Sequence, residues 1–74
     1  MVKVEYSNSE VKNCFKSEIV DDYTAERLFL KLSNGSINPA VLNEGPYTMT
    51  GISIQDDESQ VVYDTVTFIP WPWR

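Results

Sequence analysis

The sequence predicts a small, mainly β domain, in which a short N-terminal α-helix precedes about five strands that bend into a closed barrel. Three observations support this fold class. The chain has 74 residues, which is enough for one hydrophobic core and too few for two. Its apolar spacing changes from three and four residues near the N-terminus to two residues from position 27 onward. Turn residues separate the later apolar runs at short intervals.

The helix is expected at about residues 9–19 of a single domain that spans residues 1–74. Ser7 and Ser9 can cap its first turn, because their hydroxyl groups accept hydrogen bonds from free backbone N–H groups. An apolar stripe at helical spacing follows, formed by Val11, Cys14, Phe15 and Ile19. Before it, Val2, Val4 and Tyr6 alternate with polar residues, so residues 2–6 are either a short strand or an extended arm.

Strands are expected over about residues 26–70. Leu28, Leu30 and Leu32 share one face of the first strand, and Asn34-Gly35 predicts a hairpin turn after it. The return strand over residues 37–42 contains Pro39, which favours an edge position or a bulge because proline cannot donate a hydrogen bond to the sheet.

Two long strands are expected to complete the barrel. The first covers residues 47–54, where Gly51 breaks the alternation and indicates a bend. An acidic turn over residues 56–59 leads into the second, Gln60–Ile69, which is rich in Val, Thr, Tyr and Phe. A Pro/Trp tail over residues 70–74 ends the ladder.

Composition argues against several classes of function. Histidine is absent and Cys14 is the single cysteine, so we expect no disulfide, no catalytic residues, no metal site and no cofactor. Eleven acidic residues against six basic ones give a net charge of −5, which does not favour binding to phosphate by bulk charge. The sequence contains neither a signal peptide nor an apolar run of membrane-spanning length, so a cytoplasmic protein without a membrane partner is expected.

Several sequence motifs fit the pattern of one known family of small β-barrel proteins. The run from Leu28 to Gly35 resembles the first strand and the Asn-Gly turn of the Sm/Lsm/Hfq-like proteins. Glu44-Gly45-Pro46-Tyr47-Thr48 is similar to the loop Asp-x-x-(Met or aromatic)-Asn. Ser59–Tyr63, followed by Val66 and Ile69-Pro70, is similar to the second motif of bacterial Hfq. The chain departs from Hfq at Tyr63-Asp64-Thr65, where Hfq has Tyr-Lys-His.

The resemblance implies a strongly bent, five-stranded SH3-like barrel and a homo-oligomeric ring of about five to seven subunits, in which the last strand pairs with a neighbour. It also implies a non-enzymatic, RNA-chaperone-type role in which single-stranded RNA is bound. The residues at the RNA-binding positions are Tyr47, Thr48, Tyr63 and Thr65. The residues expected at the oligomer or partner interface are Val62, Val66, Phe68, Trp71 and Trp73.

Other interpretations stay open at this point. Tyr47 could cap the core, residues 63–65 could be a purely structural strand, and the two tryptophans could cover the barrel's own end. A different class of function is a small acidic inhibitor or adaptor, for example one carried by a phage, that binds a basic host protein.

Overall fold

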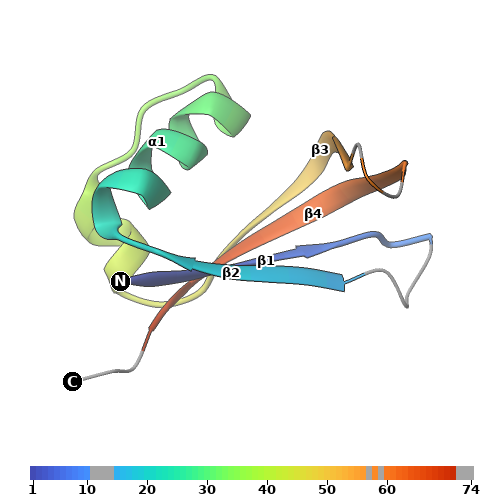
Figure 1. Cartoon of the computed structure of the whole chain (residues 1–74). Helices are drawn as coiled ribbons and strands as arrows, with labels where there is room; N and C mark the ends of the chain where they lie inside the picture. The colour runs from blue at the N-terminus through green and yellow to red at the C-terminus, as the bar shows by residue number, and fades with distance from the viewer. Residues whose placement is uncertain (11–14, 57, 59, 72–74) are drawn as a thin grey trace.

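The computed structural model describes residues 1–10, 15–56, 58 and 60–71, which form one antiparallel sheet with an α-helix on one face (Figure 1). In chain order the elements are β1 (Val2–Ser7), β2 (Phe15–Val20), α1 (Asp22–Ser33), the 3₁₀-helix η1 (Pro39–Asn43), β3 (Tyr47–Asp56) and β4 (Val61–Pro70). The strand order is β2-β1-β4-β3, so two hairpins meet through the central pair β1 and β4. The mainly β fold class is confirmed.

The expected five-stranded closed barrel is wrong, because the described residues form four strands in one open sheet. The last strand, β4, is central and pairs with β1 on one side and β3 on the other. It is therefore not the free edge through which a ring would close, and the two edges are β2 and β3. The ring itself stays a prediction, since a single chain does not test it.

The predicted helix over residues 9–19 is wrong over its described part, because Phe15–Val20 is β2. Val11 and Cys14 lie outside the described residues. Residues 15–20 pair without interruption with β1, from Ser7 opposite Phe15 to Val2 opposite Val20. This cross-strand pairing gives hydrogen-bond partners to the backbone groups of β2 that face β1, whereas a helix shorter than about 12–15 residues is marginal without tertiary support. The alternating segment over residues 2–6 is confirmed as a strand.

The predicted strand around Leu28, Leu30 and Leu32 is also wrong, because these residues belong to α1. Asp21 is the N-cap, and its carboxylate accepts a hydrogen bond from the Thr24 backbone N–H at 2.7 Å. The apolar face of the helix has helical spacing and consists of Ala25, Leu28, Phe29 and Leu32. Leu28 and Leu32 thus belong to a helical stripe, and Leu30 lies outside it.

The Asn34-Gly35 pair ends α1, where a hairpin turn was predicted. Asn34 adopts the left-handed conformation with φ of 56°, and its N–H donates to the carbonyl oxygen of Leu30. The return strand predicted over residues 37–42 is wrong as well, since η1 occupies Pro39–Asn43. The segment from Leu28 to Gly35, which supported the Sm-like resemblance, is therefore helix and helix cap.

The two C-terminal strands are confirmed as β3 and β4. The bend expected at Gly51 is also confirmed, because the register of β3 against β4 shifts between Thr50 and Ile54. Gly51 has a φ of 78°, a conformation that glycine adopts without steric cost.

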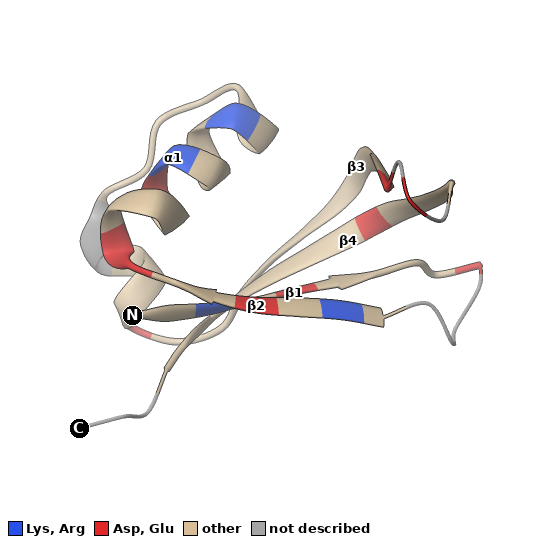
Figure 2. Cartoon of the chain, viewed as in Figure 1, with Lys and Arg blue, Asp and Glu red and all other residues tan. Residues whose placement is uncertain are grey.

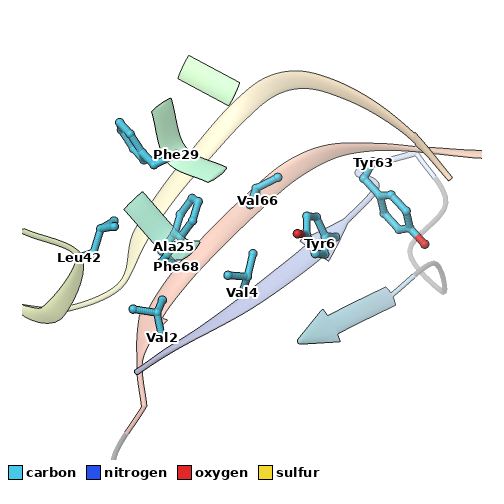
Figure 3. Packing of buried hydrophobic residues seen from close by; sticks show 9 residues of the cluster. All are labelled: Val2, Val4, Tyr6, Ala25, Phe29, Leu42, Tyr63, Val66 and Phe68. Carbon is cyan, nitrogen blue, oxygen red and sulfur yellow. The ribbon is translucent and has the colours of Figure 1, made fainter. Parts of the chain in front are cut away.

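The core lies between the sheet and the layer formed by α1 and η1 (Figure 3). The central strands contribute Val2, Val4, Tyr6, Tyr63, Val66 and Phe68, and the helical layer contributes Ala25, Phe29 and Leu42. The Phe29 ring joins the two layers, with its centroid 5.8 Å from that of Phe68. The described residues cover one face of the sheet in this way.

Candidate functional site

A groove of about 400 Å³ lies between α1 and the sheet. Its volume falls within the range of about 300–1,000 Å³ that is typical of ligand pockets. The apolar part of its wall is formed by Leu28 and Leu32 on α1 and by Ile54 on β3. These three side chains pack against the core but are only partly buried. The groove therefore presents apolar surface that the chain itself leaves half covered.

Two tyrosines from the central strands also line the groove. The ring centroids of Tyr6 and Tyr63 are 5.8 Å apart, and both residues are buried. The Tyr6 hydroxyl donates to Glu18 Oε1 at 3.0 Å, and the Tyr63 hydroxyl donates to Asp56 Oδ2 at 3.2 Å. Burial and the bond to Glu18 raise the pKa of Tyr6 above its ordinary value. The Tyr6 phenol therefore stays neutral at physiological pH and acts as a fixed donor.

Lys16 on β2 and Lys31 on α1 supply the basic groups of the groove. Figure 2 shows basic residues on both of these elements. The Lys16 ammonium lies 5.7 Å from the centroid of the Tyr6 ring, close enough for a cation–π interaction. Both lysines are exposed, and their alkyl stems can extend the apolar wall while the charges remain in water.

The structure does not bring together the four residues expected to bind RNA. Tyr47 on β3 pairs with Phe68 on β4, whereas Tyr63 lies on β4 itself and pairs with Ile54. Phe68 and Tyr63 are five residues apart along β4, which corresponds to about 16 Å. Tyr63 is buried in the core, and the Tyr47 ring packs edge-on against Phe29 at a centroid distance of 5.2 Å.

Thr48 and Thr65 lie on the other face of the sheet. The Thr48 hydroxyl is 3.1 Å from that of Thr67, and Thr65 and Thr67 alternate along β4 with buried Val66 and Phe68. The tyrosines and the threonines of the expected RNA site are therefore separated by the sheet itself.

The residues expected at an interface occupy different environments. Val66 and Phe68 are fully buried in the core, whereas Val62 is 40% exposed. Trp71 is partly buried, and its backbone N–H donates to the carbonyl oxygen of Met1 at 3.1 Å. Lys3 Nζ lies 5.5 Å from the centroid of the Trp71 ring. Trp73 lies outside the described residues. The buried pair supports the fold, so among the four interface residues that the structure describes, Val62 and the exposed part of Trp71 can reach a partner.

Asp64, at the position of the Hfq lysine, has a structural environment. Its carboxylate accepts hydrogen bonds from the Ser9 backbone N–H at 3.0 Å and from the Ser9 hydroxyl at 2.6 Å. These bonds lower the pKa of Asp64 and join the segment after β1 to β4. Among the described residues, no three acidic, cysteine or histidine side chains gather where they could hold a metal ion.

Sequence reasoning missed the groove. Lys16, Lys31 and Ile54 come from three elements that are far apart in the sequence, and no local motif joins them. One signal was available, because Leu28 and Leu32 lie four residues apart on the same helical stripe as Phe29. That stripe is wider than the buried part of α1 requires, since only Ala25 and Phe29 on it are buried.

No protein-family model, curated protein or solved structure matches this chain. Across the residues that the structure describes, no helix has the length and apolar character needed to cross a membrane.

Proposed function

We propose that this chain is a non-enzymatic adaptor or inhibitor that binds a partner protein through the groove between α1 and the sheet. The observation that carries the proposal is the half-covered apolar wall of Leu28, Leu32 and Ile54 in a groove of about 400 Å³. Covering such surface is worth roughly 25 cal/mol per Å² of apolar area removed from water. An apolar side chain of the partner is therefore the expected occupant.

The position of the groove favours a polypeptide over a small molecule. One side of it is formed by residues 53–56 of β3, and β3 is an edge strand of the sheet. An edge strand presents backbone N–H and C=O groups that have no partner strand within the sheet. A partner segment can pair with this edge while one of its side chains enters the groove.

The charge of the chain favours a partner with a basic surface. The net charge is −5, so a basic protein is attracted over long distances and an acidic one is repelled. The groove itself is mixed in charge, because Lys16, Lys31 and Asp56 all line it, so this attraction comes from the surface of the chain as a whole. Association with a partner of this kind is expected to weaken as salt concentration rises.

The test is a peptide-display selection on the folded chain, followed by calorimetry on the selected peptides. Ser53→Trp is the blocking variant, because Ser53 is exposed and lines the groove. Ser36→Trp is the matched control, since Ser36 is exposed on the loop after α1. We expect peptides with an aliphatic or aromatic anchor whose affinity falls at least about tenfold in Ser53→Trp and stays unchanged in Ser36→Trp.

Two outcomes count against the proposal. The first is a selection that yields no anchored peptide, or peptides that bind both variants equally. The second is tight, salt-sensitive binding of single-stranded poly(U) or poly(A) without any peptide ligand, which would favour the RNA-binding role implied by the Sm-like resemblance.

A further inference from the structure

The two edges of the sheet differ in how well they are protected from pairing with another chain. β3 is interrupted by Gly51 and a register shift, so its edge is regular only over short stretches on either side of the interruption. β2 pairs with β1 over six consecutive residues without any shift. Five of its residues, Phe15–Ile19, are exposed, and the sixth is partly exposed. β2 is therefore a regular edge strand that none of the residues described in the structure covers (Figure 1).

The side chains of β2 divide into two sets with different chemistry. Lys16 and Glu18 lie on the face that α1 covers, because they pair with Tyr6 and Val4 of the core. Phe15 and Ile19 lie on the uncovered face and are 62% and 40% exposed. Ser17 lies between them on that face.

We propose that two copies of this chain form a two-fold dimer by antiparallel pairing of their β2 strands, which centres on Ser17. In this register Lys16 lies opposite Glu18 of the second copy, and Phe15 lies opposite Ile19 of the second copy. Two-fold symmetry generates each of these pairs twice. Opposite charges and apolar residues placed directly across an antiparallel pair stabilise it. The two sheets then form one continuous sheet with both helices on the same face.

Neighbouring registers are much poorer. A shift of two residues in one direction places Glu18 opposite Glu18 of the second copy, and a shift in the other direction places Lys16 opposite Lys16. Like charges directly across an antiparallel pair are destabilising. A shift of one residue places the two helices on opposite faces of the joint sheet, which the two-fold symmetry does not allow. The sequence of β2 therefore specifies one register with itself.

The experiment is sedimentation equilibrium on the wild-type chain, on Lys16→Glu, on Glu18→Lys and on an equimolar mixture of the two variants. The wild-type mass is expected to rise with concentration from 8.5 kDa toward twice that value. In the dimer of either variant alone, two pairs of like charges face each other across the strands, so this dimer is expected to be at least about tenfold weaker than that of the wild type.

The mixture gives the sharpest result. One variant carries two acidic residues at positions 16 and 18 and the other carries two basic ones, so a mixed dimer restores both attractive pairs. A mixed dimer stronger than either variant's own dimer is expected, and misfolded variants would not produce it.

The proposal is overturned by a wild-type chain that stays monomeric over a roughly hundredfold range of concentration up to about 1 mM, where even a weak dimer would form. A mass that continues to rise above two chains also overturns it, because two-fold pairing closes at the dimer. Equal dimerisation of the wild type and both variants would place the interface elsewhere.

Discussion

Replacing Val66 or Val62 by alanine tests whether β4 is a core strand or an interface strand. Val66 is fully buried and Val62 is 40% exposed, although both lie on β4. Val66→Ala removes two buried methyl groups at about 0.8 kcal/mol each and leaves a cavity, so we expect it to lower the free energy of unfolding by about 2–3 kcal/mol. Val62→Ala is expected to lower it by about 1 kcal/mol or less.

The difference between the two variants is the informative quantity. Both lose the same strand propensity, so that effect largely cancels and about 1.5 kcal/mol should remain. In a domain of this size that corresponds to a difference of about 6–12 °C in midpoint temperature. Circular dichroism during thermal and urea unfolding measures it. Equal losses in the two variants, or a larger loss for Val62→Ala, would refute the assignment of Val66 to the core.

Three further predictions follow from single residues. Gly51→Ala should lower the free energy of unfolding by about 1–2 kcal/mol, because the backbone φ at Gly51 is 78°. Gly45→Ala should not lower it, since the backbone at Gly45 has no positive φ and a Cβ added there meets open space. Urea unfolding compares the two variants. Hydrogen bonds from Thr24 lower the pKa of Asp21 below 3.8. The stabilisation by this carboxylate is therefore present above pH 3.8 and disappears as the pH falls through the lowered pKa. In Asp21→Asn, acid unfolding should lack this pH-dependent loss of stability. The raised pKa of Tyr6 means that stabilisation by its neutral form is present below pH 10.0 and lost as the pH rises through the raised value. Tyr6→Phe should remove a step at high pH from an ultraviolet phenolate titration.

The Ser53→Trp and Lys16→Glu variants should leave unfolding almost unchanged, which separates binding from stability, whereas Glu18→Lys also removes the acceptor of the Tyr6 hydroxyl. Ser53 and Lys16 are both exposed, and substitutions at such positions usually change the free energy of unfolding by no more than about 0.5 kcal/mol. A large loss of stability in Ser53→Trp would mean that Ser53 supports the fold and would make that variant unsuitable as a blocking variant.

The sequence by itself determined the β-rich class and the elements whose pattern had one interpretation. Val2, Val4 and Tyr6 alternate, and β4 is dense in β-branched and aromatic residues, so both were predictable as strands. Gly51 was predictable as a bend because glycine interrupts an otherwise alternating run.

The N-terminal half was ambiguous because its apolar residues fit two periods. Leu28, Leu30 and Leu32 alternate as a strand would, but Leu28, Phe29 and Leu32 also form a helical stripe with Ala25. The Asp21 cap and the strong helix propensity of residues 25–28 favoured the helix locally. Residues 15–19 had the same ambiguity, and only the pairing of β2 with β1 made them a strand.

The groove and the free edge were decided by tertiary structure alone. The order β2-β1-β4-β3 places the last strand at the centre of the sheet, where Val66 and Phe68 become core residues. The same order leaves β2 uncovered and brings Lys16 and Ile54, 38 positions apart in the sequence, to one groove. Local propensity cannot specify such long-range pairing, because the free energy that selects it comes from joint burial of residues that no short segment contains.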